Sequence, residues 1–253
     1  MTPSDYYHVI TQGQTLYGRQ CAFFILFFSF SFIFYRYIVI HLMAQNQQQR
    51  LLAIGDSLTA GYYDSGRNFH PYANRLSELF SSAQIPVIID QRGVSGERVT
   101  PTMAKRLENL LKTNTSYDWI IILGGTNDLG MGTKAERIFR QGLEPMYEMV
   151  FNQTKAKPKL VAMTVIENGY EAPTDGGDTE RQALNTMIRD YVTQAKDQDR
   201  VCLVDLDKGI PYHAIRDVTE RQRIWSDRIH LQPAGYDRMA TLIFESIKSK
   251  LSE

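Results

Sequence analysis

The chain has 253 residues, of which 43% are hydrophobic and 22% are charged, a composition typical of globular and not of disordered proteins. Lysine plus arginine and aspartate plus glutamate both number 28, so the formal net charge is zero, which argues against nucleic-acid binding through phosphate neutralisation. The two cysteines, Cys21 and Cys202, are too few for a disulfide framework or a cysteine-based zinc site.

The N-terminal extension, residues 1–48, differs in composition from the rest of the chain. It contains one acid, Asp5, and two bases, Arg19 and Arg36. Residues 21–40 are almost wholly apolar, and a helix of that length can cross a hydrocarbon core of about 30 Å. These residues are therefore a candidate membrane-spanning segment.

Two interpretations of the extension are open. In the first, residues 21–40 form a single-pass membrane anchor, and the bases on its flanks weakly favour a cytosolic location for the following domain. In the second, Met43 is the true start, residues 1–42 are upstream read-through in the gene model, and the protein is cytoplasmic. A membrane is thus a partner only under the first interpretation.

Residues 49–253 are expected to form a single domain in which buried strands alternate with amphipathic helices. The strand runs lack polar alternation, which is typical of a parallel sheet covered on both faces. The pattern predicts a doubly wound α/β sandwich with right-handed crossovers. The expected strands are 51–54, 86–89, 117–123, 159–165 and 200–205, and the expected helices are 71–82, 100–112, 134–154, 179–196 and 233–251.

Polar and glycine residues follow the expected strands, at the sheet edge where ligands bind in such folds. The first strand is followed by Gly55-Asp56-Ser57-Leu58, the second by Gly93, and the third by Gly125-Thr126-Asn127-Asp128. Asp227 and His230 precede the last helix. Each has an ordinary structural explanation when taken alone, since serine and asparagine cap helices, glycines form turns, and histidines occur on surfaces.

Acyl transfer explains why these residue types would occur together. It needs an activated hydroxyl, a base and hydrogen-bond donors for the oxyanion. His230 can take the proton of the Ser57 hydroxyl, and one turn of chain brings Asp227 to the imidazole. Asp56 is expected to brace the turn rather than react. His70 and His213 have no carboxylate at a convincing spacing, so neither is preferred as the base.

Together the four segments resemble the four sequence blocks that define the SGNH hydrolases, also called GDSL lipases and esterases. The resemblance covers about residues 50–250. It implies a three-layer α/β/α sandwich with a flavodoxin-like, five-stranded parallel sheet. It also implies a catalytic triad of Ser57, Asp227 and His230, and an oxyanion hole made by the Ser57 and Gly93 N–H groups and the Asn127 side-chain amide.

The function expected from these features is that of a serine esterase or acylhydrolase, which cleaves a small-molecule carboxylic ester or thioester through an acyl-enzyme. No metal and no organic cofactor is expected. An acyltransferase, which passes the acyl group to an alcohol or sugar at the same site, is the alternative, and a catalytically silent binding module is a third hypothesis. The acyl and alcohol groups of the substrate and the oligomeric state stay open.

Overall fold

The computed structural model of the protein describes residues 48–113, 115–154, 156–170 and 178–251. The candidate membrane segment, 21–40, lies outside these residues, as does nearly all of the extension. Within the described ranges, no helix combines the length and the apolar character needed to cross a bilayer.

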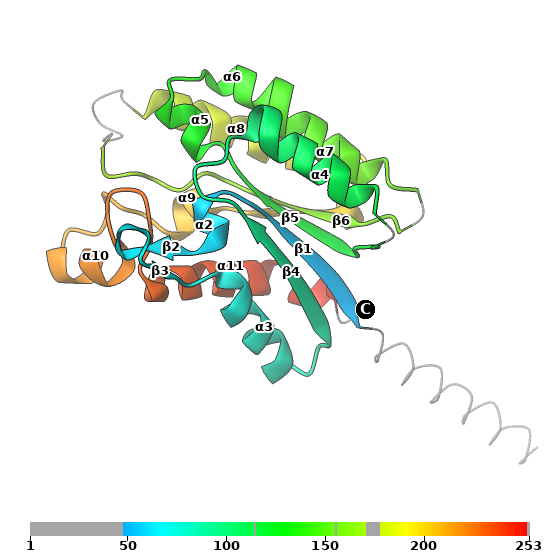
Figure 1. Ribbon diagram of the computed structural model, residues 1–253, viewed down its shortest axis with the longest axis horizontal. Helices are drawn as coiled ribbons and strands as arrows, with labels where there is room; N and C mark the ends of the chain where they lie inside the picture. Colours follow the sequence, from blue (N-terminus) through cyan, green and yellow to red (C-terminus); the bar gives the residue numbers. More distant parts are fainter. Residues whose placement is uncertain (1–47, 114, 155, 171–177, 252–253) are drawn as a thin grey trace, which may run out of the picture. The chain divides into compact units, whose positions relative to one another are not determined.

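Five parallel strands form the central sheet, in the order β4-β1-β5-β6-β7 (Figure 1). This is the strand order of flavodoxin-like sheets, so the expected fold class is confirmed. Each of the five expected strands is present with ends shifted by a few residues. The strands are β1 (Gln49–Gly55), β4 (Val87–Gly93), β5 (Trp119–Leu123), β6 (Lys159–Met163) and β7 (Val201–Val204), and a small antiparallel pair is formed by β2 (Tyr62–Tyr63) and β3 (Asn68–Phe69).

Helices cover both faces of this sheet. Alternate residues of β1 enter different cores: Leu51 and Ala53 pack on one face, and Leu52 and Ile54 on the other. All four are fully buried, which explains why the strand sequence shows no polar alternation. The first face is covered by α3 (Tyr72–Ser82) and α11 (Pro233–Leu251), and the second by α4 (Ala104–Leu111), α7 (Glu144–Phe151) and α8 (Thr179–Gln194) (Figure 1).

Two expected helices are shorter or more segmented than the periodicity indicates. The helix expected over 100–112 begins at Ala104, because Thr100 has the extended angles φ −114° and ψ 132°. The helix expected over 134–154 is divided into α6 (Ala135–Ile138), a wider helical turn and α7. Pro145 lies at the start of α7 and has no N–H to continue the regular ladder.

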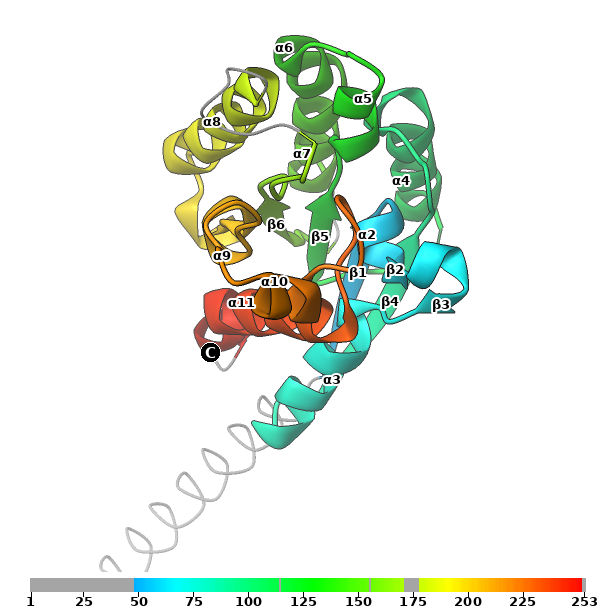
Figure 2. The same ribbon diagram turned by 90° about the vertical axis from the view of Figure 1, so that its left-hand side faces the viewer.

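The register of the sheet aligns the ends of three strands. Gly55 of β1 pairs with Gly93 of β4 and with Leu123 of β5. The residues that follow these three strands therefore emerge at one edge. Figure 2 faces this edge, where α2 (Ser57–Ala60), α5 (Thr126–Gly130) and the loop between α10 (Val218–Ile224) and α11 converge; α9 (Leu206–Gly209) follows β7.

Candidate active site

Ser57 is the first residue of α2, directly after the strand β1. Asp56 is the N-cap of this short helix, and its Oδ1 accepts the Leu58 N–H at 2.9 Å. The helix ends at Gly61, whose φ of 77° is left-handed. The expected bracing role of Asp56 is confirmed, and the tight turn fixes Ser57 at the sheet edge.

The structure brings Ser57, His230 and Asp227 together. His230 Nε2 lies 3.1 Å from Ser57 Oγ, although the two residues are 173 positions apart in the chain. His230 Nδ1 lies 2.9 Å from Asp227 Oδ2. The three side chains thus form a continuous hydrogen-bonded series from carboxylate to hydroxyl.

The environment of Asp227 fixes the direction of these hydrogen bonds. Partial burial disfavours its ionised form, but hydrogen bonds from the His230 backbone and ring and from the Ile229 N–H outweigh burial and hold the pKa of Asp227 below its usual range. An ionised carboxylate only accepts hydrogen bonds, so Nδ1 of His230 must carry a proton. In a neutral imidazole with this tautomer, Nε2 has the lone pair that can accept a hydrogen bond from the Ser57 hydroxyl.

The loop that carries His230 is held on both sides. The His230 carbonyl accepts the Ser226 N–H at 2.8 Å, and an isolated bridge joins Trp225 to Leu231. The Tyr62 ring lies against the imidazole, with the ring centroids 4.4 Å apart and the planes tilted by 41°. Sequence reasoning missed Tyr62, because no motif spacing links it to His230.

Gly93 ends β4, an edge strand of the sheet. The next residue, Val94, donates its N–H to Gly55 O at 3.0 Å. Successive N–H groups of a strand point in opposite directions, so the Gly93 N–H points away from β1. A Cβ at Gly93 would lie 2.2 Å from Ala60 N, so the close packing of β4 on α2 is what requires glycine here.

Asn127 lies in the first turn of α5, but its side chain does not cap the helix; the N-cap is Gly125, with φ 116°. Asn127 Nδ2 donates to the Glu97 carbonyl at 2.9 Å and approaches Asp56 Oδ2 at 3.5 Å. The amide is therefore directed toward the loop after β4 and the turn that carries Ser57. Glu97 was missed from sequence because its backbone carbonyl makes this contact, and a carbonyl has no residue-type signature.

Asp56 is a fully buried acid beside this amide. Burial, the largest cause, and the negative charges of Asp128 and Glu97 together raise the pKa of Asp56 to about 7, against the opposing effect of the Leu58 N–H. Burial also raises the pKa of Asp128, whose Oδ2 accepts the Val99 N–H at 2.9 Å. Asp56 therefore retains its proton well above the pH at which an exposed aspartate loses it.

The substitution Asp56→Asn is expected to alter the pH dependence of stability. The unfolded chain releases this proton near pKa 3.8, whereas folded Asp56 holds it up to about 7. Between these values the folded state binds more protons, so the wild-type free energy of unfolding falls as pH rises, by about 1.4 kcal/mol per pKa unit of difference. Urea titrations across this range should show wild type losing stability relative to the variant; a constant difference would contradict the prediction.

His70 and His213, which the sequence analysis did not prefer as the base, each contact a different part of the molecule. His70 Nε2 is 2.8 Å from Asp237 Oδ1, so in the fold His70 does have a carboxylate partner. The partner comes from α11, 167 positions away, which local spacing could not indicate. His213 Nε2 lies 2.8 Å from the Asn168 carbonyl. Among the hydrogen bonds of the described residues, neither histidine is bonded to Ser57.

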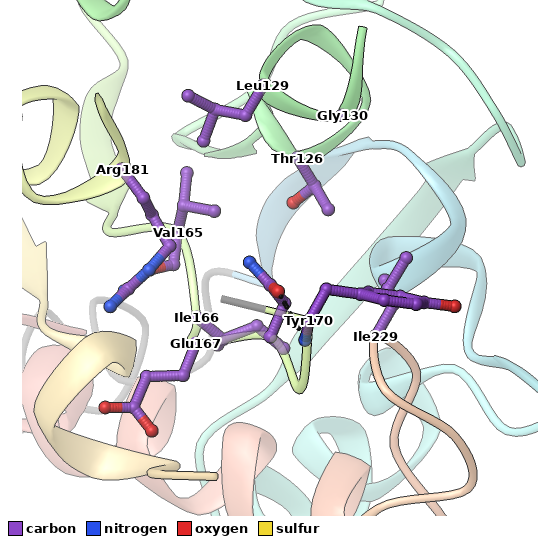
Figure 3. A pocket seen from close by; sticks show the side chains of 10 residues that line it. Thr126, Leu129, Gly130, Val165, Ile166, Glu167, Tyr170, Arg181 and Ile229 are labelled. Carbon is purple, nitrogen blue, oxygen red and sulfur yellow. Dashed lines mark hydrogen bonds between the residues drawn. The ribbon is translucent and has the colours of Figure 1, made fainter. Parts of the chain in front are cut away.

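A pocket of about 390 Å³ adjoins the site (Figure 3). Thr126 and Ile229, which directly precede Asn127 and His230, both line it. Its charged members are engaged elsewhere: Arg181 pairs with carboxylates, and the Glu167 carboxylate accepts backbone N–H groups. The lining is Thr126, Leu129, Gly130, Val165, Ile166, Glu167, Asn168, Tyr170, Arg181 and Ile229.

The pocket wall is mostly apolar. In Figure 3 the side chains of Leu129 and Val165 line one side, and Ile229 and Tyr170 the other, while Glu167 points away from Thr126. A pocket of this character favours a compact apolar group over a charged one.

Comparison with known sequences identifies one family. The model of the GDSL-like Lipase/Acylhydrolase family matches residues 53–238, a range that contains Ser57, Gly93, Asn127, Asp227 and His230. A search of curated protein sequences gives no match.

Solved structures share the fold. The Clostridium thermocellum family 3 carbohydrate esterase is 20% identical, with a TM-score of 0.61 over 81% of this chain and 98% of that chain. A putative arylesterase from Agrobacterium tumefaciens str. C58 is 19% identical, with a TM-score of 0.61 over 79% and 99% of the two chains. The lipase/acylhydrolase from Enterococcus faecalis is 20% identical, with a TM-score of 0.60 over 79% and 96%. At these identities the likeness shows a common fold.

Proposed function

Because the chain belongs to the GDSL-like lipase/acylhydrolase family and is an ester-bond hydrolase, we propose that it acts through a Ser57-His230-Asp227 triad and an acyl-enzyme. The observation that carries the proposal is the unbroken hydrogen-bond series through the His230 ring, 2.9 Å to Asp227 and 3.1 Å to Ser57. These distances lie in the range that proton transfer requires.

In the first half of the reaction Ser57 Oγ attacks the ester carbonyl carbon, and its proton passes to His230 Nε2. The imidazolium that forms is stabilised by the Asp227 carboxylate. The tetrahedral intermediate then expels the alcohol or thiol, which takes the proton from Nε2. The product of this half is an ester of Ser57 and the acyl group.

In the second half a water molecule attacks the Ser57 ester, and His230 Nε2 accepts the proton of that water. Collapse of the second tetrahedral intermediate returns this proton to Ser57 Oγ and releases the carboxylic acid. The same imidazole thus acts as base and then as acid in each half.

Three donors are proposed to stabilise the oxyanion: the N–H groups of Ser57 and Gly93 and the Asn127 amide. The outward direction of the Gly93 N–H and the orientation of Asn127 toward the Asp56–Ser57 turn support this assignment. Donors fixed before the reaction stabilise developing charge without reorganisation.

The adjoining pocket supports a small-molecule ester with a compact apolar group as the substrate. A pocket of about 390 Å³ is at the lower end of the range for small-molecule sites. Because solved proteins of this fold include carbohydrate and aryl esterases, aryl acetates and acetylated sugars are the substrates to compare first.

The experiment that tests this function is labelling with a fluorophosphonate, which phosphonylates an activated serine. Wild type is expected to be labelled once, at Ser57, with parallel loss of p-nitrophenyl acetate hydrolysis. Ser57→Ala should be neither labelled nor active. The matched control is Ser81→Ala on the exposed surface of α3, which should behave as wild type.

A wild-type protein that folds but is neither labelled nor active would contradict the proposal and favour a silent binding module. Product analysis in the presence of an added alcohol measures how the acyl-enzyme partitions between water and the alcohol. Free acid as the main product supports hydrolysis, whereas a new ester as the main product supports acyl transfer.

A further inference from the structure

Arg106 extends from α4 to the edge of the sheet that carries the site. Its Nη1 donates to the Arg92 carbonyl at 2.6 Å, and its Nη2 donates to the Gly55 carbonyl at 3.1 Å. Its Nε donates to Glu97 Oε1 at 3.1 Å, and Nη2 also pairs with Glu97 Oε2. The side chain of Glu97 is only 7% exposed and that of Arg106 24% exposed.

One of these contacts leads directly to a proposed oxyanion donor. The Arg92 carbonyl and the Gly93 N–H belong to the same peptide unit, so a hydrogen bond to that oxygen fixes the plane in which the N–H points. The C=O and N–H of one trans peptide point in opposite directions, so the Arg92 carbonyl points toward β1 when the Gly93 N–H points away from it. The guanidinium therefore adds a cationic donor on the inner side of this peptide, where the ladder between β1 and β4 ends.

The other two contacts lead to the remaining donors. Glu97, held by its carboxylate, presents its own backbone carbonyl to Asn127 Nδ2 at 2.9 Å. Gly55 lies two residues before Ser57, and its carbonyl also accepts the Val94 N–H. One side chain is therefore bonded to the chain segment next to each of the three donors.

We propose that Arg106 is a positioning residue for the oxyanion hole, a role that rests on the function proposed above. Arg106 does not touch the substrate; it acts through the backbone. A hydrogen bond from a cation to a carbonyl is stronger than a neutral one. Such a bond polarises the amide and makes its N–H a better donor, as in other hydrogen-bond chains.

The planar fork of arginine is essential to this role. It can bond two carbonyls and a carboxylate at once, whereas a lysine ammonium is a point charge on a flexible stem. Arg106→Lys should keep the charge near Glu97 but lose the simultaneous bonds to the Arg92 and Gly55 carbonyls. In Arg106→Lys the oxyanion donors should therefore be held less well, even though the ion pair with Glu97 persists.

The test compares kcat, KM and the inhibition constant of phenylboronic acid across matched variants. Ser57 Oγ bonds to the boron atom of this inhibitor as its fourth ligand. One of the oxygens on boron then occupies the oxyanion position. The main variant is Arg106→Met combined with Glu97→Gln, which removes both charges, because a lone buried carboxylate would itself destabilise the fold. Glu97→Gln alone keeps the arginine and its carbonyl bonds. Lys105→Met removes an exposed cation from the same helix.

The double variant should lose about 10- to 100-fold in kcat, less than the 10²- to 10³-fold that follows complete loss of an oxyanion donor. The inhibition constant of phenylboronic acid should rise by a similar factor, while KM changes little. Glu97→Gln should lose much less, and Lys105→Met should match wild type. A general structural role would instead lower the melting temperature without a selective loss of boronate affinity.

The proposal is overturned if the double variant matches Glu97→Gln in both kcat and boronate inhibition. If the double variant does not fold, Arg106→Lys decides: a folded protein with reduced kcat and weaker boronate binding supports positioning, and wild-type values overturn it. Failure of the wild type to react with fluorophosphonate would contradict the proposed function, whereas normal labelling with unaffected Arg106 variants would contradict only the positioning role.

Discussion

The substitution His230→Ala is expected to lower kcat by about 10⁵- to 10⁶-fold, as removal of a triad histidine does in other serine hydrolases, with little change in KM. His230 Nε2 is the proposed base and lies 3.1 Å from the Ser57 hydroxyl, and an alcohol with no base is a poor nucleophile at neutral pH. Steady-state kinetics on p-nitrophenyl acetate measure the loss, and thermal melts establish that the variant is folded.

The matched control for this variant is His70→Ala. His70 also pairs with a carboxylate, Asp237 at 2.8 Å, and is also partly exposed, but it is not part of the proposed triad. It should lose less than a few-fold in kcat. A folded His230→Ala enzyme with a wild-type rate would show that another base activates the serine.

The second large effect is expected for Asp227→Asn, which should lower kcat by about 10⁴-fold by analogy with other triads. The asparagine amide can donate to Nδ1, which would then accept and move the ring proton to Nε2. That nitrogen would donate to Ser57 Oγ and could not take its proton. The asparagine oxygen can still accept the Ile229 and His230 N–H groups that now reach Oδ1 at 2.7 Å, so the loop should keep its shape.

Asp237→Asn is the control, since it makes the same change beside His70, the other histidine paired with a carboxylate. It should leave kcat near the wild-type value. If Asp227→Asn is folded and loses less than about tenfold, roughly 1.4 kcal/mol, the tautomer of His230 must be fixed by another group, and Asp227 would be reduced to a turn-stabilising residue.

The strands of the sheet could be predicted from the sequence because each strand is a short run of neighbouring apolar residues. Leu51 to Ile54 form a continuous apolar run, and all four residues are buried against helices on the two faces of the sheet. The segments that follow the strands could also be compared with a known family, and that comparison led to the correct fold class. The helix ends were less predictable, since Thr100 and Pro145 interrupt helices whose apolar periodicity continues.

The contacts that orient the site could not be predicted in the same way. Tyr62 lies against His230, Arg106 reaches the carbonyls of Arg92 and Gly55, and Asp237 pairs with His70. These partners are separated by long stretches of chain. Where the acceptor is a backbone carbonyl, every residue type offers the same group.

Gly93 is a single residue for which the sequence and the structure give different information. The sequence marks it as a glycine after a strand and, through the resemblance, as a candidate oxyanion donor. The structure gives a different reason for the glycine: a side chain would collide with the Ala60 backbone of α2. That close packing follows from the way β4 and α2 meet at the sheet edge.

By itself, then, the sequence determined the fold class and the identities of the proposed triad, because apolar periodicity and short motifs are properties of neighbouring residues. Only the tertiary structure decided that His230 meets Ser57 across 173 positions, that Asn127 is directed away from its own helix terminus, and that one guanidinium binds the chain next to all three proposed donors. These features depend on how separate elements pack, and packing is set by the distances and directions of side chains that only the folded chain brings together.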